Sequence, residues 1–162
     1  MRAGVLTVSD RVSRGEAEDH SGPRAAELLA AWGFAVEVRV VPDGVAEVEA
    51  GLRSFLASGV ALVVTTGGTG FGPRDLTPEA TRGIIEREAP GLSEAMRAAT
   101  FGFNPHGMLS RGIAGIAGTA LVVNLPGSVK GVEESLAVIG PALRHACELA
   151  AGEPSEHRSG LC

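Results

Sequence analysis

A short glycine-rich segment has the residue types and spacing to bind an anion. Thr66-Gly67-Gly68-Thr69-Gly70 directly follows the apolar run 60–65. Three glycines in five residues allow a tight turn in which backbone N–H groups approach an anion closely. No Gly-Lys-Ser or Gly-Lys-Thr follows, and Pro73 occupies the place of the third glycine of a dinucleotide-binding motif. The segment is therefore predicted to hold a phosphate group without being a Walker A loop or a dinucleotide fingerprint.

Two aspartates near this segment have the chemistry of a magnesium site. Asp43 and Asp75 each lie in a loop that follows a predicted strand. Mg²⁺ prefers carboxylate oxygens in combination with phosphate oxygens. We therefore predict that Asp43 and Asp75 bind Mg²⁺ and align the substrates, and that the neighbouring Arg74 offers its charge to a phosphate. For Asp10 and Asp19, a role in turns or helix capping is as consistent with the sequence as a functional one.

Other loops are expected to reach the same place. Ser9-Asp10 follows the first predicted strand, and Asn124-Leu125-Pro126-Gly127-Ser128 follows the last one. Since the carboxyl ends of parallel strands meet at one edge of a sheet, we expect these loops to gather there, with the only lysine, Lys130, within reach. Three histidines have no partner at metal-ligand spacing and are interpreted as surface or core residues: His20, His106 and His145.

The hydrophobic pattern alternates along the chain between the strand period and the helix period. Strands are predicted at 5–8, 35–41 and 60–65, and helices at 21–32, 45–57, 78–88, 92–99 and 132–150. Residues 113–124 are expected to form a hairpin, or an edge strand followed by an inner strand. Ser21 is predicted to cap the first helix, and Pro141 to kink or break the last one near 139–140. This order predicts an α/β fold with three α/β/α layers and a mostly parallel, doubly wound sheet that carries a small β-hairpin or edge strand.

Length and composition indicate one domain. The 162 residues suit a single core, which we place at residues 1–151, with 152–162 as a flexible tail. A net charge of −5 argues against a nucleic-acid partner, which requires a basic surface. No stretch reaches the roughly 20 apolar residues that span a bilayer, so no membrane partner is expected. The two cysteines lack disulfide-like spacing, and we expect a cytoplasmic protein.

Five motifs stand in order between Gly4 and about Leu149. They are GVLTVSD at 4–10, VPD at 41–43, TTGGTG at 65–70 with RDLTPEAT at 74–81, MLSR at 108–111 and NLPGS at 124–128. This set resembles the molybdopterin adenylyltransferases, a family that includes the Mog-type proteins and the G domain of gephyrin.

The resemblance implies a reaction and a set of site residues. Members of that family transfer the AMP part of Mg-ATP to the terminal phosphate of molybdopterin and release pyrophosphate, before a partner protein inserts molybdenum. The resemblance further implies one molybdopterin-binding domain, a homotrimer, and Mg²⁺, ATP and molybdopterin as ligands. It implies three groups of residues: catalytic and metal-binding Asp43 and Asp75; nucleotide- and phosphate-binding Ser9, Asp10, Gly67, Gly68, Thr69 and Gly70; and pterin-binding Ser110, Arg111, Asn124, Pro126, Gly127 and Ser128.

Alternative functions remain open. MoaB-type relatives resemble this chain in the glycine segment, and those among them that lack the aspartates are expected to be inactive. A non-catalytic pterin-binding scaffold, similar to gephyrin, is a second alternative. The presence of Asp43, Asp75 and the 124–128 segment favours the active nucleotidyltransferase. A nucleotide-dependent oxidoreductase is disfavoured because the dinucleotide fingerprint is missing.

Overall fold

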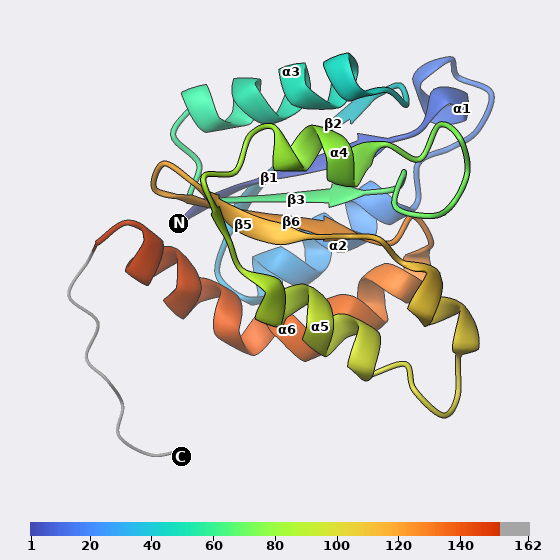
Figure 1. Cartoon of the computed structure of the whole chain (residues 1–162). Coiled ribbons are helices and arrows are strands. Elements are labelled where there is room, and N and C mark those ends of the chain that lie inside the picture. The colour runs from blue at the N-terminus through green and yellow to red at the C-terminus, as the bar shows by residue number, and fades with distance from the viewer. Residues whose placement is uncertain (153–162) are drawn as a thin grey trace.

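The structure is a computed structural model, and it describes residues 1–152. Apart from Gly152, the tail predicted at 152–162 lies outside the described residues. The described chain alternates strands and helices (Figure 1). The elements are β1 (Arg2–Val8), α1 (Asp10–Ser13), α2 (Ser21–Ala31), β2 (Ala35–Val41), α3 (Val45–Ala57), β3 (Leu62–Thr66), α4 (Thr77–Arg82), β4 (Arg87–Glu88), α5 (Pro90–Ala98), a 3₁₀ helix η1 (Pro105–Leu109), β5 (Ala114–Ala117), β6 (Ala120–Leu125) and α6 (Val129–Ala150).

The strands form one mixed sheet in the order β2-β1-β3-β6-β5-β4. β2, β1, β3 and β6 are parallel to one another, while β5 runs antiparallel to β6 and β4 antiparallel to β5. The prediction of a mostly parallel sheet with a small hairpin is therefore confirmed. The strand order reverses between β1 and β3, and such switch points are where sheets of this class bind ligands.

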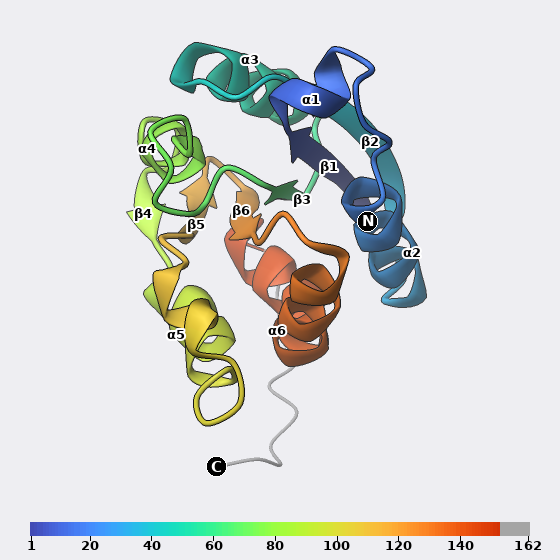
Figure 2. The same ribbon diagram turned by 90° about the vertical axis from the view of Figure 1, so that its right-hand side faces the viewer.

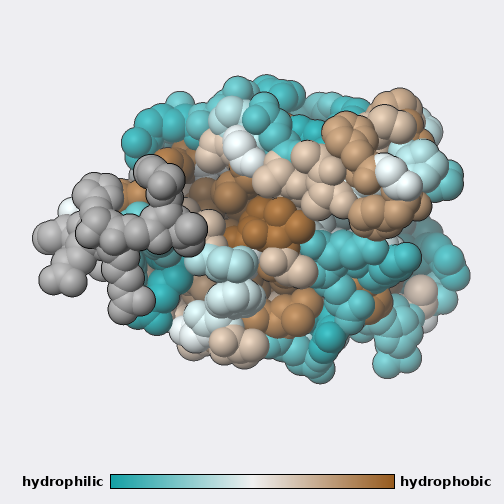
Figure 3. Space-filling view, turned by 90° about the horizontal axis from the view of Figure 1, so that it is seen from below, coloured by the Kyte–Doolittle hydropathy of each residue, from teal (hydrophilic) through white to brown (hydrophobic). Residues whose placement is uncertain are grey.

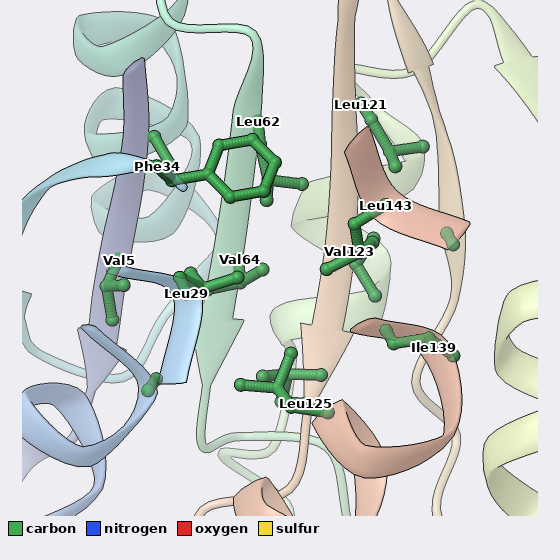
Figure 4. Close-up of a cluster of buried hydrophobic side chains, with 14 of the residues drawn as sticks. Val5, Leu29, Phe34, Leu62, Val64, Leu121, Val123, Leu125, Ile139 and Leu143 are labelled. Carbon is green, nitrogen blue, oxygen red and sulfur yellow. The ribbon is translucent and has the colours of Figure 1, made fainter. Parts of the chain in front are cut away.

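Helices cover both faces of the sheet and produce the predicted three layers (Figure 1 and Figure 2). Alternate side chains of β3 point to opposite faces, because the side-chain period of a strand is two. Leu62 and Val64 pack in the cluster under α2 and α6, whereas Val63 packs in the cluster under α3 and α4. Figure 4 shows the first cluster, in which side chains of β1, β3 and β6 meet those of α2 and α6. Burial of each large aliphatic side chain stabilises the fold by about 1.5–3 kcal/mol.

The buried apolar stripe of α6 explains why this helix continues through Pro141. Leu136, Ile139, Leu143 and Cys147 all lie in the core, at a spacing of three or four residues. Pro141 lacks an N–H, yet α6 continues through it to Ala150, so the proline does not break the helix, and the kink stays a prediction. Packing on both sides of the proline holds the helix together. The same burial raises the pKa of the Cys147 thiol to about 11.

The helix predicted at 78–88 is much shorter in the structure. α4 ends at Arg82, and Gly83 follows as its C-cap. The amide of Glu86 then donates to the carbonyl of Ile116 at 2.8 Å, and Arg87 begins the pairing with β5. The edge of β5 that faces away from β6 offers backbone partners, which the helix periodicity of the sequence does not reveal. Pairing with this edge overrides the helix propensity of residues 83–88.

Two local predictions also need correction. Ser21 is the first residue of α2 and not its cap. Asp19 supplies the capping oxygen, because its Oδ1 accepts the Gly22 amide at 2.9 Å while its Oδ2 accepts the Thr7 hydroxyl at 2.7 Å. Ser128 caps α6 by accepting the Gly131 amide at 3.0 Å, so that this helix begins three residues earlier than predicted.

The outer surface mixes polar and apolar residues. Seen from the side of α5 and α6, apolar residues gather near the middle of the face and at its right-hand end (Figure 3). None of the helices within residues 1–152 has the length and apolar character needed to cross a membrane.

Candidate functional site

The loops after β1, β2, β3 and β6 meet at one edge of the sheet, as the parallel order predicts (Figure 2). The amide of Ser9 donates to the carbonyl of Val41 at 3.0 Å, which joins the loops after β1 and β2. The Thr66 hydroxyl donates to the carbonyl of Pro126 at 2.8 Å, which joins β3 to the loop after β6. Predicted site residues from four separate strands are therefore brought together.

Gly67 and Gly68 hold the glycine segment in a conformation that other residues rarely adopt. Their φ angles are +103° and +63°, and a Cβ atom on Gly67 would lie 2.3 Å from the carbonyl oxygen of Val8. The buried Thr77 fixes the turn from the other side. Its amide donates to the carbonyl of Gly68 at 3.0 Å, and its hydroxyl donates to the carbonyl of Gly67 at 3.0 Å. Both the torsion angle and the available space require glycine at position 67.

Three consecutive amides of this segment have no protein acceptor. Within residues 1–152, the N–H groups of Gly68, Thr69 and Gly70 make no hydrogen bond to the protein, whereas that of Gly67 donates to the carbonyl of Leu125 at 3.4 Å. Consecutive backbone N–H groups of this kind bind phosphate and other anions. The predicted anion-binding role of the segment therefore has a geometric basis.

These amides border a cavity of about 490 Å³, which we call the main cavity. It lies between the glycine segment, α5, η1 and the start of α6, and its volume is typical of a small-molecule site. Lys130 lines it as well, with its Nζ 3.7 Å from Oε1 of Glu134. Most of the predicted site residues line this cavity: Gly67, Gly68, Thr69, Gly70, Asp75, Ser110, Asn124, Pro126, Gly127 and Ser128.

The two predicted metal-binding aspartates have different surroundings. Asp75 lines the main cavity, and its Oδ2 accepts the Gly72 amide at 2.8 Å. Asp43 lies outside the cavity lining, where its Oδ2 accepts the Asp10 amide at 2.8 Å. Arg74 connects the two regions, because it precedes Asp75 in the chain and its Nη2 donates to the carbonyl of Asp43 at 2.6 Å.

The carboxylates fit a magnesium ion only if a substrate completes its coordination. Within residues 1–152, no group of three or more His, Cys, Asp or Glu side chains is arranged to hold a metal. Mg²⁺ usually takes one or two carboxylates and completes its coordination with water and substrate phosphates. In the described chain, the Oδ1 atoms of Asp43 and Asp75 each accept no hydrogen bond and are available as ligands. Each carboxylate therefore has one oxygen that could bind an ion brought in with a nucleotide.

Arg74 does not offer a free charge to a phosphate, contrary to the sequence-based prediction. Its Nε donates to Oδ2 of Asp10 at 2.7 Å, and its Nη2 donates to Oδ1 of the same carboxylate at 3.1 Å. The guanidinium hydrogen bond holds the pKa of Asp10 below its ordinary value, and Asp10 in turn raises the pKa of Arg74. The charge of Arg74 is thus balanced within the protein.

Arg111 contacts the glycine segment from outside the main cavity. Its backbone amide donates to the carbonyl of Thr69 at 2.9 Å, and its Nε donates to the carbonyl of Gly70 at 2.8 Å. The guanidinium also donates to the carbonyl of Asp75 and forms an ion pair with Glu79. This ion pair lowers the pKa of the Glu79 carboxyl. Arg111 lines neither the main cavity nor the second cavity, which is described below.

Asn124 is buried, and protein groups occupy its side-chain amide. Nδ2 donates to the hydroxyls of Thr65 at 3.0 Å and Thr81 at 2.8 Å, and Oδ1 accepts the Ile113 amide at 3.2 Å. The side chain therefore joins β6 to β3, α4 and the start of β5. The structure brings Asn124 to the predicted site, where its bonds hold the wall of the cavity.

A second cavity of about 410 Å³ shares part of this wall. Gly67, Gly127 and Ser128 line both cavities, and a Cβ atom on Gly127 would lie 3.1 Å from the Cα of Gly67. Ser9 and Asp19 line the second cavity. Two neighbouring cavities with a common glycine wall provide space for two small molecules at one sheet edge.

Sequence reasoning missed the contribution of α5 and the segment that follows it. Ser93, Met96, Arg97 and Thr100 line the main cavity and repeat at helical spacing, so the periodicity of the predicted helix already contained this signal. His106 in η1 also lines the cavity, although a surface or core position was predicted for it from the sequence. η1 had a local signal that the sequence-based prediction did not use: Asn104 caps it by accepting the His106 amide at 3.2 Å, and Pro105 follows at its first position.

Comparison with known proteins gives a consistent result. A family profile described as "Probable molybdopterin binding domain" matches residues 4–145. Gephyrin from Dictyostelium discoideum is 40% identical over 172 residues, which cover 96% of this chain and 24% of that protein. Molybdopterin adenylyltransferase from Escherichia coli K12 is 39% identical over 140 residues, which cover 84% of this chain and 72% of that protein. The chain spans only 25% and 49% of two other curated relatives.

The fold has close matches among solved structures. The molybdopterin biosynthesis enzyme MoaB from Thermus thermophilus superposes with a TM-score of 0.89 and 45% sequence identity. The match covers 96% of this chain and 99% of that one. The three-layer arrangement built up from the sequence is thus found in experimentally determined proteins.

Proposed function

The chain belongs to the family of probable molybdopterin binding domains, and we propose that it is a molybdopterin adenylyltransferase. In this reaction the AMP part of ATP is transferred to the terminal phosphate of molybdopterin, and pyrophosphate is released. The observation that carries the proposal is the main cavity, where the unbonded amides 68–70, Asp75 and the 124–128 loop border one space. The 39% identity to a molybdopterin adenylyltransferase supports the same activity.

The proposed chemistry requires positioning and charge compensation, and it needs no protein nucleophile. An oxygen of the molybdopterin phosphate forms a bond to the α-phosphorus of ATP, and the bond between that phosphorus and the pyrophosphate oxygen breaks. The attacking oxygen is already anionic, so no protein group has to remove a proton from it. The amides of Gly68, Thr69 and Gly70 would donate to phosphate oxygens, and Lys130 would offset part of the negative charge.

Magnesium has a defined place in this proposal. Bound Mg²⁺ would offset the charge of the polyphosphate and align the leaving pyrophosphate. Asp43 and Asp75 are the residues that would hold it, through the Oδ1 atoms that accept no hydrogen bond within residues 1–152.

The two substrates are proposed to occupy the two ends of the sheet edge. The pterin would lie in the main cavity against Ser110, Asn124 and the 126–128 loop. The nucleotide would extend from the glycine segment towards Ser9, which lines the second cavity, and towards Asp10, the next residue in the chain. The shared wall of Gly67 and Gly127 supports this arrangement, because it brings the reacting phosphates of both substrates to one place.

Three further properties are proposed from the resemblance to Mog-type proteins. The chain would act as a homotrimer, would work in the cytoplasm, and would pass its product to a protein that inserts molybdenum. An alternative function is a non-catalytic pterin-binding scaffold, which is considered because the chain is 40% identical to a gephyrin.

One assay separates the enzyme from the scaffold. The protein is incubated with ATP, Mg²⁺ and molybdopterin, and pyrophosphate is measured against a control without pterin. We expect release of about one pyrophosphate for each adenylylated pterin, in keeping with the stoichiometry of nucleotidyl transfer. Pyrophosphate no higher than the control, together with pterin binding, would favour the scaffold.

A further inference from the structure

We propose that Arg111 is a positioning residue whose guanidinium, paired with Glu79, fixes the end of the glycine segment relative to Asp75. This inference rests on the proposed adenylyl transfer and adds a residue pair that acts from behind the site. It also differs from the pterin-binding role that the resemblance implies for Arg111.

The first argument is the planarity of the peptide bond. The carbonyl of Thr69 and the N–H of Gly70 belong to one rigid peptide unit and point in opposite directions. The Arg111 amide holds that carbonyl at 2.9 Å, and its Nε holds the carbonyl of Gly70 at 2.8 Å. The main-chain bond to Thr69 turns the Gly70 N–H away from Arg111, and Gly70 lines the main cavity. The bond from Nε to the Gly70 carbonyl is the part of this contact that depends on the side chain.

The second argument concerns Asp75. A turn already holds this residue, because its amide donates to the carbonyl of Gly72 at 3.0 Å and its Oδ2 accepts the Gly72 amide at 2.8 Å. Nη2 of Arg111 adds a bond to the carbonyl of Asp75. The same guanidinium thus holds the glycine segment and Asp75 in one fixed relationship.

The third argument is that Arg111 has little capacity left for a ligand. Its guanidinium has five N–H groups, and Gly70, Asp75 and Glu79 together accept four hydrogen bonds from it. Neither Arg111 nor Glu79 lines the main cavity or the second one. A lysine at position 111 could not reproduce this set of bonds, because its single nitrogen cannot match the planar fork.

The test uses Arg111→Lys and Glu79→Gln, with Arg82→Gln as the control. Arg82 is an exposed arginine on α4 that lies outside both cavities. Turnover and KM for both substrates are measured from pyrophosphate release. If Arg111 and Glu79 act by positioning the glycine segment and Asp75, both Arg111→Lys and Glu79→Gln should lower kcat about 10–100-fold, and KM for molybdopterin should change less than about threefold. Arg82→Gln should match the wild type.

A second measurement does not depend on activity. Hydrogen exchange, followed by mass spectrometry with residue-level resolution, reports on the amides of Gly72 and Asp75 in the free protein, because these two amides donate hydrogen bonds within the turn that Arg111 contacts. We expect these amides to exchange at least about tenfold faster in Arg111→Lys and Glu79→Gln, with an unchanged rate in the β1 and β3 peptides as evidence of an intact fold.

The outcomes are distinct. Unchanged exchange of the Gly72 and Asp75 amides would overturn the proposal, as would a raised KM for molybdopterin in Arg111→Lys alone with normal kcat. In a protein that releases no pyrophosphate, the adenylyltransferase proposal fails. The exchange measurement then still decides whether Arg111 and Glu79 hold the segment.

Discussion

Asp10 and Asp43 each accept the backbone amide of the other residue. The Asp10 amide donates to Oδ2 of Asp43 at 2.8 Å, and the Asp43 amide donates to Oδ1 of Asp10 at 3.1 Å. This reciprocal pair ties the loop after β1 to the loop after β2, although the two residues are 33 positions apart. Asp10 also pairs with Arg74, which favours a structural role for its carboxylate, whereas Oδ1 of Asp43 accepts no hydrogen bond in the described chain.

The first prediction concerns Asp75→Asn. The amide oxygen of asparagine can still accept the Gly72 N–H, so the turn and the fold should persist. Loss of the negative charge should lower AMP transfer by roughly 10²–10³-fold, as is typical when one preorganised group at a reacting centre is removed. Pyrophosphate release measures turnover, and thermal unfolding checks the fold. Glu94→Gln, which removes an exposed carboxylate from α5 outside the cavity lining, is the matched control. Near-normal turnover of Asp75→Asn would remove this residue from the mechanism.

The second prediction is a pH dependence of stability that Arg74 causes. Its guanidinium holds the pKa of Asp10 below the ordinary value of 3.8. A lowered carboxyl pKa stabilises the folded protein above about pH 3.8, and this contribution is lost as the pH falls through the lower folded value. Arg74→Gln should therefore destabilise the protein at pH 7, with a difference from the wild type that shrinks at acid pH. Urea unfolding at pH 7 and pH 3 measures this.

A double-mutant comparison isolates the ion pair. In an Asp10→Asn background, Arg74→Gln removes the bond to the carbonyl of Asp43, which does not titrate, and the weaker attraction between Arg74 and the carboxylates of Asp43 and Glu47. The effect of Arg74→Gln should thus depend much less on pH in that background than in the wild type. A difference between wild type and Arg74→Gln that stays constant from pH 7 to pH 3 would contradict the assignment.

Much of the fold could be predicted because periodicity and breakers marked it clearly. The bounds of β2 and α3 agree with the sequence-based ranges, since Pro42, Gly44 and Gly59 interrupt the pattern around them. β4 could not be predicted, because its two residues become a strand only through pairing with β5. Likewise, Asp19 and not Ser21 caps α2, and competing polar side chains in one loop have no sequence signal that ranks them.

The candidate site was predictable to a similar degree. The rule that parallel strands end at one edge placed Gly67 and Gly127 together, and a Cβ on Gly127 would indeed contact the Cα of Gly67. Which polar side chains pair with one another within the protein was not predictable. The sequence predicted that Arg74 offers its charge to a phosphate, and the resemblance implied that Arg111 binds the pterin, but Asp10 and Glu79 pair with these two side chains in the structure. Long side chains reach partners that only the folded geometry reveals.

The third prediction concerns Gly67→Ala. A Cβ atom there would lie 2.3 Å from the carbonyl oxygen of Val8, at a φ angle of +103°. Backbone strain alone costs about 1–3 kcal/mol, and the clash should add to this and displace the glycine segment. Gly59→Ala is the control, because Gly59 has a φ angle of +75° but no atom within 4 Å of the added Cβ. We expect Gly67→Ala to lower the unfolding midpoint more than Gly59→Ala and to impair transfer, which Gly59→Ala should spare. Equal effects of the two changes would show that the contact with Val8 is unimportant.

The fourth prediction separates a structural from a ligand-binding role of Asn124. The Asn124→Leu change puts an apolar side chain of similar size in the buried position and removes the acceptor of the Ile113 amide. A buried N–H without a partner costs about 1–3 kcal/mol, and the Thr65 and Thr81 hydroxyls also lose their shared donor. We therefore expect a lower free energy of unfolding in urea.

Binding of molybdopterin by the same variant completes this test. If Asn124 acts by holding the wall, Asn124→Leu should bind the pterin weakly only to the extent that it is unfolded or locally disordered. The companion change Thr81→Val removes one bond of the same network and should produce a smaller loss in the same direction. A stable Asn124→Leu protein with molybdopterin affinity reduced about tenfold or more would instead assign the amide to the ligand, because only a lost direct contact lowers affinity without lowering stability.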